Sequence, residues 1–173
     1  MEIAGVYDTP GAISSCLKSA FNQNDAGIIV LYEVYSWPNV ILTLIGGYIV
    51  DHLGLLRMTL VFSGLVTLGQ PLLGVGVQIS SYNVEVIGRT IYGLGGETLK
   101  VAQNTLTVRW APPHISLLFG LVTALGRIAG TLNFAITPTL ASQSITLAAW
   151  VGTGIVIASL VIGILIILVG ERN

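Results

Sequence analysis

Charged residues are scarce in this sequence. Only 9% of its 173 residues are Asp, Glu, Lys or Arg, whereas 53% are hydrophobic and the mean hydropathy is +0.85. Soluble domains carry about 25% charged residues, because a surface that faces water needs them. The composition therefore predicts that lipid, rather than water, surrounds most of the chain.

Cysteine and net charge are equally limited. Cys16 is the single cysteine, which excludes an internal disulfide framework and a cysteine-based metal site. No other metal-ligating or catalytic cluster stands out, so we predict no metal, no cofactor and no enzyme activity. The formal net charge of −1 gives no reason to expect a nucleic-acid partner. Residues 1–5 lack the basic and apolar regions of a signal peptide.

Five segments are long and apolar enough to cross a bilayer, since a span takes about 20 residues of helix. An open sheet would leave its edge amides without partners in lipid, so we predict an all-α membrane protein. The expected parts are a luminal or extracellular loop over 1–26 and a partial bundle over 27–173, with spans at about 27–50, 55–77, 82–108, 115–137 and 145–169.

The basic residues of the connections predict the orientation, because cytosolic loops are richer in Lys and Arg. Arg57, Arg109 and Arg172 fall on one side of the predicted spans, and Lys18 falls on the other. We therefore expect the connections that contain Arg57 and Arg109 to face the cytosol.

Glycines cluster within the third predicted span, at Gly93, Gly95 and Gly96. Small residues inside a span let two helix backbones approach closely. A nucleotide-binding loop is the alternative, but no strand precedes these glycines and no P-loop lysine follows them. The pattern favours helix packing.

The third span also carries charges at membrane depth, and each costs about 2.5–3.5 kcal/mol to insert. At about 100° per residue, its polar side chains share an arc of roughly 120°. Such a face is tolerated against a water-filled cavity that admits a solute, or within a structural ion-pair network, and the sequence leaves both open. The members of this face are Glu85, Arg89, Glu97, Lys100, Gln103 and Asn104.

Two opposite charges lie near the predicted midplane. Glu97 is about 22 Å along its helix from Tyr82, and Arg127 is about 15 Å from Thr137 on the neighbouring antiparallel span. Transporters place their solute sites at this depth. A carboxylate binds an ammonium group and a guanidinium binds a carboxylate, so the pair suits a zwitterion such as an amino acid or short peptide.

The first span adds Glu33 and Trp37, which share nearly the same helix face. They line the mouth of the cavity in one interpretation and sit at the membrane interface in the other, and both stay open. The aromatic residues Tyr32, Tyr35 and Trp37 are typical of an interfacial belt.

Two motifs resemble the major facilitator superfamily. The connection after the first span is similar to the superfamily's cytosolic loop signature, with His52 in place of the usual Arg or Lys, and Gly88-Arg89 followed by Gly93 resembles its fourth-helix arginine motif. Shorter stretches, such as residues 35–40 and 102–105, look like its branch of lysosomal dipeptide transporters. The loop signature is carried by Gly47, Asp51, His52, Gly54 and Arg57.

The resemblance implies twelve spans in two bundles that work by alternating access, with the loop signature as a conformational gate. It implies a dipeptide uniporter of the lysosomal membrane, in contact with lipid and with a glycosylated accessory membrane protein. Glu97 and Arg127 fall where the peptide termini bind, and we predict that Arg89, Lys100 and Asn104, on the polar face of Glu97, also bind the substrate.

By the same resemblance the five spans are helices two to six of a truncated N-terminal half. We expect this chain to be inactive without the missing C-terminal bundle. Two alternatives stay open: a superfamily carrier of a sugar, an organic anion or a proton-coupled solute, and a non-transporting membrane interaction protein.

Overall fold

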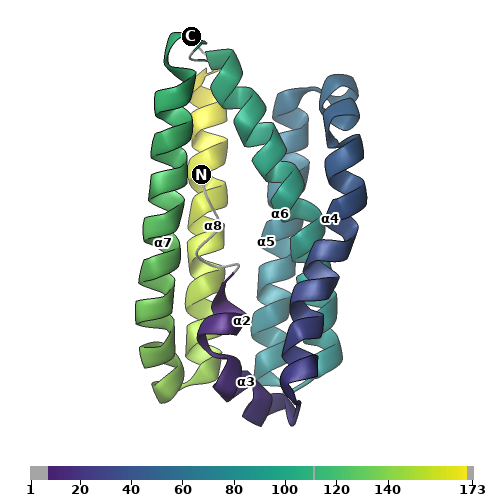
Figure 1. Ribbon diagram of the computed structural model, residues 1–173, viewed down its shortest axis with the longest axis vertical. Coiled ribbons are helices and arrows are strands. Elements are labelled where there is room, and N and C mark those ends of the chain that lie inside the picture. The colour runs from purple at the N-terminus through teal and green to yellow at the C-terminus, as the bar shows by residue number, and fades with distance from the viewer. Residues whose placement is uncertain (1–7, 111, 171–173) are drawn as a thin grey trace.

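The computed structural model describes residues 8–110 and 112–170, and these residues form helices joined by short turns (Figure 1). Five long helices correspond to the five predicted segments, and each begins or ends within a few residues of its predicted bounds. They are α4 (Asp25–Leu53), α5 (Leu55–Gln78), α6 (Tyr82–Trp110), α7 (Ile115–Gln143) and α8 (Ile145–Gly170). Side chains are not described at residues 43, 44, 47, 50, 51, 53, 110, 112 and 166–170.

Three of these helices are long and apolar enough to cross a membrane: α5, α7 and the part of α8 up to Leu165. The helix α6 does not meet this measure because of the charges along it, which include Glu85, Arg89 and Lys100. In α4 the side chains of several apolar residues lie outside the described part. The all-helical class is thus confirmed, and the count of five spans stays a prediction.

Two short helices lie inside segment 1–26, which was predicted to be a luminal or extracellular loop. They are α2 (Thr9–Ala12) and α3 (Ser14–Phe21). Ile13, Leu17 and Phe21 recur every fourth residue, so they share one helix face, and all three are buried. This segment folds because that short apolar face has the ends of α4, α5 and α8 to pack against.

The helix α6 packs mainly on α5 and α4, and small residues set how closely it does so. A Cβ atom at Gly69 of α5 would lie 2.6 Å from the backbone nitrogen of Tyr92 in α6. A Cβ at Gly95 would lie 2.6 Å from the carbonyl oxygen of Phe62, and one at Gly93 equally close to that of Tyr35. These contacts confirm that the glycines of the third span serve helix packing.

The second pair of long helices, α7 and α8, is joined to the first group mainly through contacts of α8 with α5. Within the described residues α7 contacts α8 and α2 more than α6, and most of its surface is exposed. Figure 1 shows α2 between α7–α8 on one side and α4 on the other. The short N-terminal helices therefore bridge two parts of the bundle.

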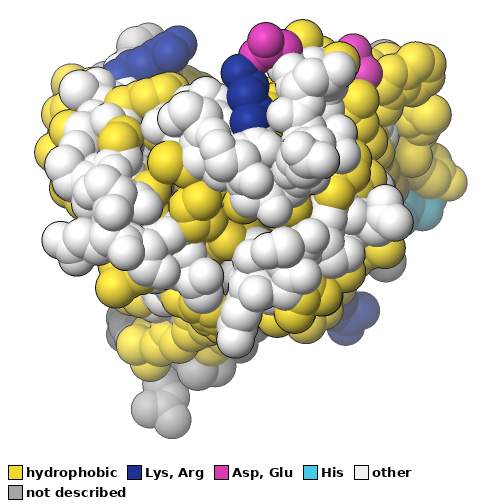
Figure 2. Space-filling view, turned by 90° about the horizontal axis from the view of Figure 1, so that it is seen from below, with side chains coloured by type: hydrophobic (Ala, Val, Ile, Leu, Met, Phe, Trp, Pro, Cys, Tyr) yellow, Lys and Arg dark blue, Asp and Glu magenta, His cyan; other side chains and the backbone are white. Residues whose placement is uncertain are grey.

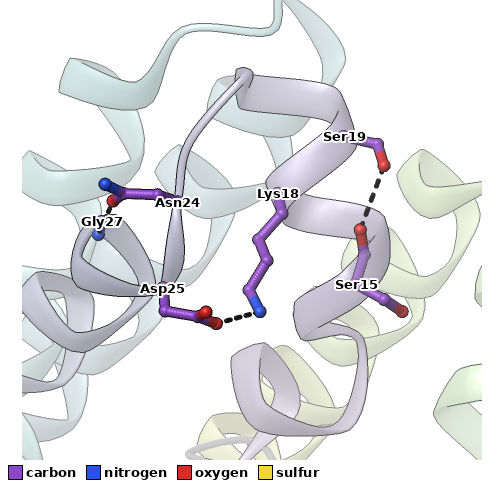
Figure 3. A network of polar contacts seen from close by, with 6 residues as sticks. All are labelled: Ser15, Lys18, Ser19, Asn24, Asp25 and Gly27. Atoms are coloured by element: carbon purple, nitrogen blue, oxygen red, sulfur yellow. Dashed lines mark hydrogen bonds and ion pairs between the residues drawn. The ribbon is translucent and has the colours of Figure 1, made fainter.

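The end of the molecule that carries α3 and the start of α4 is mostly uncharged. Seen from this end, hydrophobic and neutral polar atoms dominate, with a few charged side chains among them (Figure 2). Lys18 of α3 forms an ion pair with Asp25 at the first residue of α4, and Asn24 accepts a hydrogen bond from the Gly27 amide (Figure 3). These contacts fix the turn between α3 and α4.

Candidate solute-binding site

Glu97 lies on the face of α6 that packs against α4. The hydroxyl of Tyr35 donates a hydrogen bond of 3.1 Å to Glu97 Oε1, and the Lys100 ammonium lies 2.8 Å from the same oxygen. Tyr35 itself is only 5% exposed. It fits there because Gly93 and Gly96 carry no side chain, and a Cβ at Gly96 would lie 2.9 Å from the Tyr35 hydroxyl. Glu97 is therefore held in place from two helices.

The position of Tyr35 corrects the aromatic-belt interpretation for this residue. A belt residue lies at the membrane interface, whereas Tyr35 is buried between α4 and α6. The sequence contained a signal for this position, because Asn39 follows one turn later and donates a 2.7 Å hydrogen bond to the Tyr35 carbonyl oxygen. Polar residues inside a membrane span almost always face the interior of the bundle, so Asn39 indicates the buried side of this helix.

Arg127 lies on α7, and its side chain is exposed. Within the described part of the chain, no hydrogen bond or ion pair involves its guanidinium. The structure thus leaves Arg127 available to a ligand, but it does not bring Arg127 into contact with Glu97. The two helices that carry these charges touch each other over a short stretch.

Arg89 and Glu85 lie deep in the bundle, near the start of α6. Arg89 is 1% exposed and Glu85 is 3% exposed, and the charge of Arg89 acts on the Glu85 carboxyl. The Arg89 guanidinium also lies 5.8 Å from the ring centre of Tyr32 and 6.0 Å from that of Tyr92, within cation–π range. The adjoining cavity of about 20 Å³ is too small for a solute. This end of the polar face is built as a structural cluster.

The polar face of α6 therefore changes character along the helix. Its first half is buried, whereas Glu97 and Gln103 are half-buried and Lys100 and Asn104 are exposed. Glu33 and Trp37 of α4 are also exposed, and Trp37 at 74% belongs to an apolar stripe that continues through Ile41.

The proposed gate is described only in part. Gly54 separates α4 from α5 with a φ of 80° and a ψ of 143°, a conformation that is open to glycine and strained for other residues. His52 Nδ1 donates a 3.1 Å hydrogen bond to the Tyr48 carbonyl oxygen, and the His52 ring stacks on the Tyr48 ring. Arg57 is exposed. The side chains of Gly47 and Asp51 lie outside the described residues.

A larger cavity of about 290 Å³ lies between α7 and α8, beside Thr9 of α2. Its lining is mainly aliphatic. Its polar groups include Asn133, whose Oδ1 accepts hydrogen bonds of 2.6 Å from Thr137 and 3.4 Å from Thr9. Neither Glu97 nor Arg127 lines this cavity or the smaller one.

Comparison with known proteins decides the family. Residues 4–173 match the Major Facilitator Superfamily, which is nearly the whole chain. The chain belongs to the major facilitator superfamily. Its apolar helices and this membership together make it a multi-pass membrane protein. Superfamily membership also points to transport rather than to catalysis.

Curated superfamily members resemble this chain over 129 residues. The protein named lysosomal dipeptide transporter MFSD1 is 38% identical in Danio rerio and 37% identical in Mus musculus and in Homo sapiens. Each alignment covers 73% of this chain and 28% of the relative. The chain therefore aligns with little more than a quarter of the length of these relatives.

Proposed function

We propose that this chain contributes the solute site of a lysosomal carrier for dipeptides and similar small zwitterions. In this proposal α4 to α8 are five membrane spans, and residues 1–26 form the luminal connection before them. The carrier works as a uniporter by alternating access. The connection between α4 and α5 acts as the gate, and Gly54 supplies its sharp turn.

The observation that carries the proposal is the pair of opposite charges on α6 and α7. Arg127 keeps its charge in any surroundings and has no partner within the described residues. A guanidinium in that state is suited to a carboxylate, which it binds with two parallel hydrogen bonds. Glu97, held by Tyr35, supplies the acidic group for an ammonium. The name of the relatives supports the dipeptide class and the lysosome.

The remaining partners follow from the same proposal. A second bundle of six helices faces the polar sides of α4, α6 and α7 and completes the cavity, and lipid covers the apolar stripe that contains Trp37. A glycosylated accessory membrane protein is a further partner in this proposal. In the cavity Lys100, Asn104 and Glu33 contact the solute or its water, and Arg89 holds the fold of the site from the buried side.

The test is uptake of a radiolabelled dipeptide into proteoliposomes that contain the full-length carrier with both bundles, since we propose that the 173-residue chain alone is inactive. We expect Arg127→Ala and Glu97→Gln each to reduce uptake by about tenfold or more, because each removes a charge-assisted hydrogen bond to the solute. Arg109→Ala is the matched control, since Arg109 is an exposed arginine at the end of α6. Uptake at the wild-type rate by the Arg127 and Glu97 variants would refute the site.

A second candidate rests on the ion pair of Glu97 with Lys100. If that pair persists when solute binds, Glu97 is neutralised and Arg127 remains as the charge that faces the solute. Such a site favours an organic anion over a zwitterion. Competition of dipeptide uptake by simple monocarboxylates separates the two, since an anion carrier is inhibited by them and a zwitterion carrier is not.

A further inference from the structure

Asp8 is an acidic residue outside the predicted spans, and it lies against α7. It stands just before α2, at φ −80° and ψ −2°, and its side chain makes no capping hydrogen bond to that helix. Instead, its Oδ2 atom lies 3.6 Å from the position that a Cβ would have at Gly130. This distance corresponds to ordinary van der Waals contact, so the Asp8 carboxylate packs directly against α7 at Gly130.

The helix α2 holds Asp8 at this place through contacts on both sides. Thr9 donates a hydrogen bond to Asn133 of α7, and Pro10 is buried. On the other side, a Cβ at Gly11 would lie 2.6 Å from the Tyr32 hydroxyl of α4. Asp8 is half-buried, and its carboxylate faces α7 at Gly130.

Arg127 precedes Gly130 by three residues on the same helix. That spacing corresponds to a rise of about 4.5 Å and a rotation of about 60°, so the two positions are neighbours on one face. Within the described residues, neither Asp8 nor Arg127 has an ion pair or a side-chain hydrogen bond. The Asp8 carboxylate and Arg127 thus lie on the same side of α7, at positions about one helical turn apart, and neither is paired within the described residues.

Glu97 differs from Asp8 in this respect, because its carboxylate already binds Lys100 and Tyr35. A solute ammonium must displace Lys100 to reach Glu97, whereas Asp8 requires no exchange. An extended dipeptide measures about 7 Å between its ends. This length matches two charges one turn apart when the long Arg127 side chain extends away from Asp8, in the direction that helical side chains tilt.

We propose that Asp8 is a further solute-binding residue, which holds the ammonium end of a zwitterion whose carboxylate is bound by Arg127. This inference rests on the proposed function and names a second acidic ligand for the same solute.

The experiment compares two probes that differ only in the ammonium group, alanyl-alanine and N-acetyl-alanyl-alanine. Their affinities for the purified full-length carrier, which contains both bundles, are measured in detergent by calorimetry. We expect Asp8→Asn to lower the affinity for alanyl-alanine by about tenfold or more. The affinity for the acetylated probe should stay within about twofold of the wild-type value. Asp25→Asn is the matched control, because Asp25 is an exposed aspartate that pairs with Lys18 at the surface.

The outcomes separate this inference from the proposed function. One outcome is that the wild type binds alanyl-alanine, Arg127→Ala lowers the affinity for both probes, and Asp8→Asn lowers the affinity for neither. That outcome refutes the role of Asp8 and leaves the carrier proposal standing. An equal loss of affinity for both probes in Asp8→Asn, at an unchanged melting temperature, also refutes the role of Asp8. If Asp8→Asn lowers the melting temperature, Asp8→Glu keeps the charge and must restore discrimination between the probes. Wild-type protein that binds neither probe refutes the proposed function itself.

Discussion

Replacement of Gly69 by alanine tests the close packing of α5 on α6. The added Cβ would lie 2.6 Å from the Tyr92 nitrogen, 2.8 Å from the Tyr92 Cα and 2.9 Å from the Gly88 carbonyl oxygen. All three are backbone atoms, so no side-chain rotation relieves the clash. Since carbon contacts are optimal at about 3.5–4.0 Å, the two helices must move apart by about 1 Å around this point.

The cost follows from the contacts that such a separation weakens. A gap of about 0.5–1 Å removes a quarter to a half of the dispersion energy of each affected pair. Overpacking of this kind lowers the free energy of unfolding by about 1–3 kcal/mol. For a chain of this size, we expect the melting temperature of Gly69→Ala to fall by about 2–12 °C.

Gly64 provides the control within the same helix, because no atom lies within 4 Å of the position of its Cβ. Alanine is favoured over glycine inside a helix by about 0.5–1 kcal/mol, so Gly64→Ala should match or exceed the wild-type melting temperature. Both variants are measured by thermal unfolding of the purified protein in detergent. A Gly69→Ala protein as stable as Gly64→Ala would show that α5 and α6 do not approach as described.

Two further substitutions test the site and the gate. Tyr35→Phe removes the hydroxyl that bonds Glu97, and we expect a loss of about 1 kcal/mol in unfolding free energy, with uptake of the solute reduced because Glu97 is no longer held from α4. Tyr48→Phe is the control. The Tyr48 ring stacks on His52 and not on Glu97, so this substitution should leave uptake unchanged. Gly54→Ala forces a non-glycine residue to φ 80° and should lower the free energy of unfolding by about 1–3 kcal/mol, measured as a lower melting temperature. Gly120→Ala in α7 is the control, because no atom lies within 4 Å of its Cβ position, and it should not destabilise the protein.

The sequence alone determined the class of the protein and the approximate bounds of its long helices. Hydrophobic runs of 20 or more residues form helices in lipid whatever surrounds them, because backbone hydrogen bonds are satisfied within each segment. The charges of α6 were equally visible, since an acid or base in a hydrophobic run is a local feature. The same reasoning missed α2 and α3, where the apolar face of Ile13, Leu17 and Phe21 is short and depends on its partners.

Only the tertiary structure decided what each charge does. Glu85, Arg89, Glu97 and Lys100 lie on one arc of one helix, yet the first two are buried and the others are half-buried or exposed. The difference comes from the neighbours, because α5 and the N-terminal helices cover the start of α6 and leave its later turns open. Helical periodicity places side chains on a common face, but it does not say which length of that face another helix covers.

The contacts of Asp8 and Tyr35 could not be predicted from the sequence either, because both residues contact partners that are distant along the chain. Asp8 precedes a four-residue helix and has no local pattern that predicts a role, and the local signal for Tyr35 is limited to Asn39 one turn later. Their neighbours, Gly130 and Glu97, lie 122 and 62 residues further along the chain. Local composition determined that this chain enters a membrane as helices, whereas contacts between distant residues decided which side chains are left free to meet a solute.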